Sequence, residues 1–243
     1  MKIIIATIKE WNIVRARRLK EQYQGIHEVL IVTQKEELTY EAVCQFAPDY
    51  ILLPHWSYYI VPQITDQWEC VVFHMTDLPY GRGGSPLQNL IVRGHKETKI
   101  SAIKVTEVLD GGPIYMKKPL SLEGSAHEIF ERCADIIFEE MIPCFLKEKI
   151  IPIPQEGEPV LFRRRKSQEG ELLPEMSLET FYDYIRMLDA EGYPRAFLDY
   201  GPYRLCFEAA QLAEDGSTLE AKVTFHRMDK NNAACGFESG RED

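Results

Sequence analysis

The sequence predicts an α/β fold in which a doubly wound, mostly parallel sheet has helices on both faces and is followed by a small, mainly β module. Three observations support this prediction. Short, apolar, β-branched runs alternate with segments of helical periodicity through the first half of the chain, which is typical of doubly wound sheets. A long amphipathic helix and a proline-rich connector come next. Beyond the connector, apolar residues alternate with a period of two, as in antiparallel strands.

The first half of the chain supplies the parallel sheet. Apolar runs predict strands at residues 2–7, 29–32, 50–53 and 70–74. Helical spacing between the first three runs predicts helices at residues 10–23 and about 40–46. Parallel strands need such crossovers, because a hairpin turn would reverse the direction of the chain.

After the fourth strand, the sequence predicts a helix at residues 86–93, and alternating residues at 101–115 predict antiparallel strands at the edge of the sheet. A helix with an apolar stripe extends to Met141, and Pro143 should end or kink it. Residues 150–159 predict an extended connector. We therefore expect a catalytic domain at 1–149 and a small C-terminal α+β module at 150–243, with a helix at 178–188 and strands at 196–200, 203–209 and 219–225.

Composition narrows the class of protein. The chain has 243 residues, 45% of them hydrophobic, and a formal net charge of −10. No apolar run approaches the roughly 20 residues of a membrane span, so we expect a cytoplasmic protein without a membrane partner. The acidity predicts no nucleic-acid partner, and we interpret the basic run at 163–166 as a solvated turn. No spacing of His, Cys, Asp and Glu predicts a metal site.

Two titratable residues follow strands at places where ligands bind in α/β sheets. His74 stands where the fourth strand meets a loop rich in glycine and proline, and Asp110 precedes Gly111 and Gly112. Either residue alone is as well explained by a structural role, His74 in packing and Asp110 in an Asx turn. A histidine beside a carboxylate can hold and move a proton. We predict that His74 and Asp110 are the catalytic pair.

The glycine-rich loop at residues 81–86 has the outline of a phosphate-binding turn before a helix. Pro86 stands where a dinucleotide fingerprint would have its last glycine, and no matching acid follows the first strand. This disfavours an NAD-binding domain. The loop is an ordinary tight turn on one interpretation and a rim for the phosphates of a nucleotide-linked substrate on the other.

Three spaced motifs resemble those of the folate-dependent formyltransferases, the family of methionyl-tRNA formyltransferase, the glycinamide ribonucleotide enzyme and the sugar N-formyltransferases. The matching residues are His74, Thr76 and Pro79, then Arg82, Gly83 and Pro86, then Leu109, Asp110 and Gly112. The segments at 162–172 and 185–197 resemble those that follow the catalytic domain in the tRNA and sugar enzymes. The resemblance therefore covers most of the chain and implies a Rossmann-like formyltransferase fold.

The resemblance also implies site roles. The formyl donor would be 10-formyltetrahydrofolate, and His74 would be the general base or electrostatic stabiliser with Asp110 as its partner. Residues implied to bind the folate are His55, Trp56, Tyr59, Ile60 and Leu109. Residues implied to bind the acceptor substrate are Thr76, Arg82, Gly83, Gly84, Ser85 and Gln88.

Val72 departs from the family pattern, because it occupies the position of the family's catalytic asparagine. Valine has no side-chain donor for the oxygen of the formyl group as that oxygen gains negative charge. Our hypothesis is that protonated His74, or a backbone N–H of residues 82–85, supplies the missing hydrogen bond.

The main functional prediction is an N-formyltransferase acting on the amine of a nucleotide-linked amino sugar, expected to be a homodimer. The alternatives are a methionyl-tRNA formyltransferase, disfavoured here by the acidity and a short C-terminal part, and a catalytically impaired protein that binds folate or a sugar nucleotide. Hydrolysis of the formyl donor also remains open.

Overall fold

The computed structural model describes residues 1–228, which form two compact units. The first unit contains residues 1–86, 97–120 and 131–162, and the second contains residues 87–96, 121–130 and 163 onward. Among the described residues, no helix has both the length and the apolar character needed to cross a membrane.

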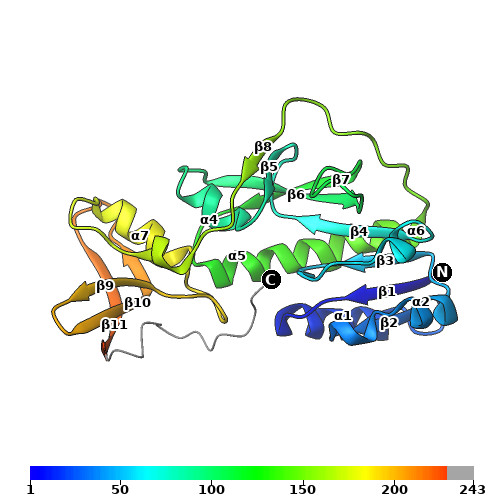
Figure 1. The fold of residues 1–243 in the computed structure, drawn as a ribbon, viewed down its shortest axis with the longest axis horizontal. Helices are drawn as coiled ribbons and strands as arrows, with labels where there is room; N and C mark the ends of the chain where they lie inside the picture. The colour runs from blue at the N-terminus through cyan, green and yellow to red at the C-terminus, as the bar shows by residue number, and fades with distance from the viewer. Residues whose placement is uncertain (229–243) are drawn as a thin grey trace. The chain divides into compact units, whose positions relative to one another are not determined.

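A six-stranded sheet forms the centre of the first unit, in the order β2-β1-β3-β4-β6-β7. Figure 1 shows these strands, which are β1 (Lys2–Ala6), β2 (Glu28–Val32), β3 (Tyr50–Leu53), β4 (Glu69–His74), β6 (Glu97–Lys104) and β7 (Ile114–Ser121). Strand β1 is parallel to β2 and β3, and β3 is parallel to β4. Strand β6 is antiparallel to β4. This topology confirms the predicted mostly parallel sheet.

Helices cover both faces of the sheet because alternate side chains of its buried strands point in opposite directions. On one face, Ile4 and Ile51 belong to an apolar cluster with Val43 and Ile64. On the other face, the ring of Phe145 lies 5.3 Å from that of Tyr50 and 6.5 Å from that of Phe73. The helical segments of the N-terminal part are α1 (Glu10–Gln22), η1 (Lys35–Glu37), α2 (Tyr40–Phe46) and α3 (Pro62–Thr65).

The long helix does not end at Pro143, which was one of the two predicted outcomes, but continues to Lys147 after an interruption. Helix α5 (Ala126–Asp135) is followed by a π-helical turn, η2 (Ile136–Met141), and then by α6 (Ile142–Lys147). A proline inside an α-helix removes one hydrogen bond and clashes with the preceding turn. Here it lies at the start of α6, directly after the wider π turn, where the regular ladder is already interrupted.

The connector after α6 is part of the first unit. Ile153 and Ile114 exchange two backbone hydrogen bonds, of 2.7 and 2.9 Å. Farther along, β8 (Val160–Phe162) pairs in parallel with β5 (Tyr80–Gly83). These contacts extend the first unit to residue 162, whereas the sequence predicted one boundary after residue 149.

The second unit contains the predicted mainly β module. Its antiparallel sheet has the order β11-β10-β9, and α7 begins at a Ser177 cap, whose side chain accepts a hydrogen bond from the backbone of Thr180. The strands are β9 (Ala196–Tyr200), β10 (Tyr203–Leu212) and β11 (Leu219–Arg227), and the helical segments are α4 (Pro86–Ile91), η3 (Ser167–Gly170) and α7 (Leu178–Arg186).

Candidate active site

His74 is the last residue of β4 and is buried, with 9% of its side chain exposed. Its Nε2 lies 2.8 Å from the backbone oxygen of Gly81. A carbonyl oxygen can only accept a hydrogen bond, so this contact assigns a proton to Nε2. The loop that follows the strand therefore fixes both the direction and the tautomer of the ring.

The other ring nitrogen faces a carboxylate. Nδ1 of His74 lies 3.6 Å from Oδ1 of Asp110, whose side chain is 11% exposed. In the neutral ring Nδ1 carries a lone pair, so two acceptors face each other across a distance longer than a hydrogen bond. A proton on Nδ1, or a donor group entering beside both atoms, removes this mismatch. The pair is therefore arranged to receive a proton.

The backbone around Asp110 fixes the position of its carboxylate. Asp110 has φ = 50°, a left-handed conformation that is uncommon outside glycine, and its Oδ2 accepts a 2.8 Å hydrogen bond from the amide of Gly83. Two residues later, a Cβ on Gly112 would lie 1.8 Å from the carbonyl oxygen of Lys104. The Leu-Asp-x-Gly motif thus contains a glycine because no side chain fits there.

Arg82 is held by a residue that the sequence analysis did not identify. Nε and Nη2 of Arg82 donate to Oε1 of Gln155 at 3.1 and 2.8 Å. Nε2 of Gln155 donates to the carbonyl oxygens of Asp110 and Gly112, both at 2.8 Å. A single amide therefore connects the loop of the predicted acid to the guanidinium predicted to bind substrate.

The glycine loop uses its own amides for internal contacts. The N–H of Gly83 donates to Asp110, and the N–H of Gly84 donates to the carbonyl oxygen of Phe162 at 3.0 Å. Neither is directed to a phosphate or an oxyanion in this conformation. This removes two of the backbone donors that we expected to compensate for Val72.

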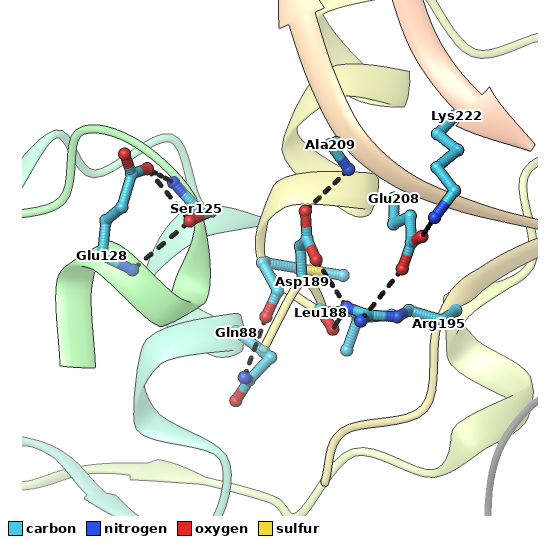
Figure 2. A network of polar contacts seen from close by, with 10 residues as sticks. Gln88, Ser125, Glu128, Leu188, Asp189, Arg195, Glu208, Ala209 and Lys222 are labelled. Carbon is cyan, nitrogen blue, oxygen red and sulfur yellow. Dashed lines mark hydrogen bonds and ion pairs between the residues drawn. The ribbon is translucent and has the colours of Figure 1, made fainter. Parts of the chain in front are cut away.

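The other predicted substrate-binding residues have different surroundings. Thr76 is fully buried, and its hydroxyl lies 3.3 Å from the same Gly81 oxygen that His74 contacts. Ser85 precedes α4 with φ = 49°. Gln88 is buried in the second unit, where its amide donates to the carbonyl oxygen of Met187 at 3.0 Å. Figure 2 shows this contact, which gives Gln88 a packing role. Substrate binding by Thr76, Arg82, Gly83, Gly84, Ser85 and Gln88 stays a prediction.

Four of the predicted folate residues lie at 55–60, after β3, the strand next to β4. The fifth, Leu109, directly precedes Asp110. His55 has φ = 56°, and its ring lies edge-on to Trp11 at 5.8 Å. Burial, with a smaller contribution from Lys9, lowers the pKa of His55 to about 4, so its ring is neutral at neutral pH. The side chains of Tyr59 and Leu109 are 81% and 72% exposed, and Ile60 is half-buried. The Nε1 atom of Trp56 is buried without a hydrogen-bond partner among the described residues.

Val72 is directed to the same side of β4 as His74, because the two are separated by one residue. It packs against the cluster that contains Ile51 and Cys70, and its backbone pairs with Leu53 and Ile103. The position therefore serves the apolar core as well as the edge of the site. This packing accounts for a branched apolar side chain there, but it supplies no donor.

Two residues that stabilise the site were missed. The hydroxyl of Ser101, opposite His74 in the β4–β6 pair, donates to the carbonyl oxygen of Thr76 at 2.7 Å. Gln155 lies in the connector, and only its polar character among prolines could have drawn attention to it. Within residues 1–228, no three His, Cys, Asp or Glu side chains are arranged to hold a metal ion.

Fold and site together define a class of protein: an α/β fold in which a buried histidine at the end of β4 faces an aspartate in the loop between β6 and β7. Two family models match the chain. The model "Formyl transferase" matches residues 28–136, and "Methionyl-tRNA formyltransferase, C-terminal domain" matches residues 167–226. A solved structure named methionyl-tRNA formyltransferase, from Clostridium thermocellum, is 52% identical, with a TM-score of 0.91 over 94% of this chain and 100% of that chain. The chain belongs to the formyltransferase family, as the motifs predicted.

Two further relatives are more distant. The methionyl-tRNA formyltransferase of Geobacillus thermodenitrificans is 26% identical over 70% of this chain, and the match spans only 56% of that enzyme's length. The structure of HypX from Aquifex aeolicus in complex with tetrahydrofolic acid has a TM-score of 0.72 at 18% identity, over 88% of this chain and 38% of that chain. At 18% identity, the similarity to HypX shows only that the two proteins share a fold. The predictions of a formyltransferase and of a folate donor agree with these findings.

The comparisons contradict the prediction of an amino-sugar nucleotide as acceptor. They favour the alternative, methionyl-tRNA formyltransferase. The expectation of no nucleic-acid partner is contradicted for the same reason. Both predictions relied on the net charge of the whole chain, which averages over separate surfaces and does not exclude a local basic segment such as residues 163–166. The short C-terminal part was the second ground against the tRNA enzyme, yet residues 167–226 match the model of that enzyme's C-terminal domain.

Proposed function

We propose that this protein transfers a formyl group from 10-formyltetrahydrofolate to the amino group of methionyl-tRNA. One observation carries the proposal: His74 Nδ1 and Asp110 Oδ1 face each other at 3.6 Å in a chain that is 52% identical to a protein named methionyl-tRNA formyltransferase. Formation of an amide from an amine releases a proton, and this pair is arranged to receive one.

The residues after β3 fit a folate. Trp56 Nε1 is a buried donor with no partner among the described residues, and Tyr59 and Leu109 expose apolar surface to solvent. A flat heterocycle with acceptor atoms suits such a lining. When bound, 10-formyltetrahydrofolate supplies an activated formyl carbon.

The proton step follows from the hydrogen bonds of the pair. Because Nε2 of His74 already donates to Gly81, the ring accepts a proton only at Nδ1. An amine N–H beside Nδ1 and Oδ1 of Asp110 would be oriented by both acceptors. As the new C–N bond forms, the amine proton moves to this pair. The C–N bond of the donor breaks, and the pair passes the proton to the leaving nitrogen, which would depart as tetrahydrofolate. The amide of Gly83 keeps the carboxylate of Asp110 in place meanwhile.

The direct test is formylation of methionyl-tRNA by the full chain, measured by mass spectrometry of the aminoacyl group released by mild base. N-formylmethionine should appear only when both 10-formyltetrahydrofolate and aminoacylated tRNA are present. Acetylated methionyl-tRNA is the matched control, since it has no free amine. Absence of N-formylmethionine at micromolar protein would contradict the proposal.

The basic run at 163–166 gives the proposed tRNA partner a second test. Arg163 is 75% exposed at its side chain and pairs with Glu169 at 2.7 Å, and Arg164 is also exposed. Contacts with phosphates release counterions, so the affinity for tRNA should fall as salt rises. Replacing Arg164 by alanine should lower both the affinity and the slope of this dependence, by about one unit for one lost phosphate contact. An unchanged slope would show that Arg164 makes no contact with the phosphates of the tRNA.

A further inference from the structure

Gln155 makes an unusual number of directed contacts for a residue in a connector. Its amide nitrogen donates to Asp110 and Gly112, and its oxygen accepts twice from Arg82, over distances of 2.8 to 3.1 Å. All four bonds lie within the first unit. Gln155 is 45 residues beyond Asp110 and 73 beyond Arg82, so only the fold brings them together.

The chemistry of a primary amide suits this position. Carbonyl oxygens require donors and a guanidinium requires an acceptor, and a glutamine side chain offers both at one end. Turning the amide over would place its NH₂ against Arg82 and its oxygen against two carbonyls. The contacts therefore determine the orientation of the amide, and glutamate would lose the donors while keeping an acceptor.

The loop that bears Asp110 needs such support. Asp110 has φ = 50°, a left-handed conformation that is unfavourable for a residue with a side chain. The preceding Val108 and Leu109 are 60% and 72% exposed, so little apolar burial fixes the loop. Gln155 binds the carbonyl oxygens of Asp110 and Gly112, on both sides of Gly111.

We propose that Gln155 is a positioning residue for formyl transfer, holding the Asp110 loop and Arg82 in one arrangement so that the carboxylate faces His74. The role in formyl transfer rests on the proposed function. The hydrogen bonds of Gln155 go to the guanidinium of Arg82 and to backbone oxygens, so Gln155 acts on the Asp110 loop through its backbone. The connector does not depend on it for attachment, because Ile153 pairs with Ile114 and β8 pairs with β5.

The first test needs no substrate. The amide of Gly83 donates to Oδ2 of Asp110, so its hydrogen exchange reports whether the carboxylate is in place. In Gln155→Ala, exchange at Gly83 should accelerate about tenfold or more, while amides of β1 keep their protection. Glu156→Ala, an exposed neighbour in the connector, is the matched control and should leave Gly83 unchanged. Unchanged exchange at Gly83 in Gln155→Ala would overturn the inference.

The second test is kinetic and separates positioning from general stability. We expect kcat to fall about tenfold to a hundredfold in both Gln155→Ala and Gln155→Glu, with KM for the folate donor nearly unchanged. In an Asp110→Ala background, Gln155→Ala should cause a clearly smaller loss, because no carboxylate remains to be positioned and only the placement of Arg82 is affected. An equal loss in both backgrounds would show that Gln155 acts independently of Asp110 and would overturn the proposal. If the wild-type chain does not formylate methionyl-tRNA, the proposed function fails while the exchange experiment still decides the positioning.

Discussion

Two groups of charged residues, one in each unit, differ in how completely their charges are paired. In the second unit, Figure 2 shows Arg195 between Asp189 and Glu208, at 2.5 and 3.1 Å. Asp189 also accepts from the backbone of Ala209 at 2.7 Å, and Glu208 is paired with Lys222 at 2.5 Å. Every carboxylate in this network has at least two donors.

The pair in the first unit is different. His74 Nδ1 and Asp110 Oδ1 are more buried than the network of the second unit, yet they lie 3.6 Å apart with no shared hydrogen. Compensated charges contribute to stability and specify the packing of loops. Two buried titratable groups that do not share a hydrogen bond contribute little to stability, and they are free to bind or transfer a proton. Substitutions in the two places should therefore affect different measurements.

The largest expected effect is on catalysis in the first unit. His74→Ala and Asp110→Asn should each lower the rate of formyl transfer about 10²- to 10⁴-fold, because proton transfer is lost. The double variant should be little worse than either single one, since the two act as a unit. Melting temperatures should change only slightly. Steady-state kinetics check the first result and calorimetry the second.

His226→Ala is the matched control, because His226 is exposed on β11 in the second unit. It should retain normal activity. Near-normal turnover in His74→Ala would contradict the assignment of the pair.

The second effect is on stability, in the second unit. Arg186 is 4% exposed, pairs with Asp183 at 2.7 Å, and donates to the carbonyl oxygens of Leu122 and Gly124 at 2.6 and 2.9 Å. Arg186→Met leaves these acceptors without a donor and should lower the free energy of unfolding by about 3 kcal/mol. Urea denaturation measures this.

Lys222→Ala is the comparison for Arg186, because it removes an ion pair whose lysine is 69% exposed. Its cost should be below about 1 kcal/mol. Equal losses in the two variants would show that burial does not decide the strength of these contacts.

The third effect tests His55, a titratable residue that the sequence predicted to bind the folate. Burial lowers the pKa of His55 to about 4 from its ordinary value of 6.5. The unfolded state therefore binds more protons between these values, so stability is full above pH 6.5 and is lost as the pH falls toward 4. The contribution is about 2 kcal/mol after allowance for partial exposure. In His55→Gln, the unfolding free energy should depend less on pH across this range, and an identical profile would contradict the burial argument.

The smallest effect concerns the missing asparagine. The amides of Gly83 and Gly84 and the Nε2 proton of His74 are already donated within the protein. Val72→Asn should therefore add a useful donor and raise turnover about tenfold. This gain is smaller than the rate effect of a well-placed oxyanion donor, because the asparagine also disturbs apolar packing. A fall in turnover at unchanged folding would show that another group already supplies this hydrogen bond. Single-turnover kinetics make the comparison.

The sequence by itself predicted the alternation of strands and helices in the first part of the chain, the mostly parallel sheet and the approach of His74 to Asp110. It did not predict the short elements α3, β5 and β8. The predicted features depend on local periodicity and on short motifs at strand ends, and Gly112 belongs to such a motif because only glycine fits beside Lys104. The family followed from the same motifs. The acceptor substrate was not predicted correctly from the sequence. The overall charge of the chain was used to exclude tRNA, although only the charge of the binding surface matters.

Only the tertiary structure decided how the site is supported. Gln155 donates to the Asp110 loop from a connector that has no helical or strand periodicity. The carbonyl oxygen of Phe162 accepts a hydrogen bond from the amide of Gly84 where β8 pairs with β5. Hydrogen bonds between segments so far apart depend on the path of the chain, and no spacing in the sequence indicates them. The assignment of residues 87–96 and 121–130 to the second unit has the same origin, since Gln88 donates to Met187 and the carbonyl oxygen of Leu122 accepts from Arg186.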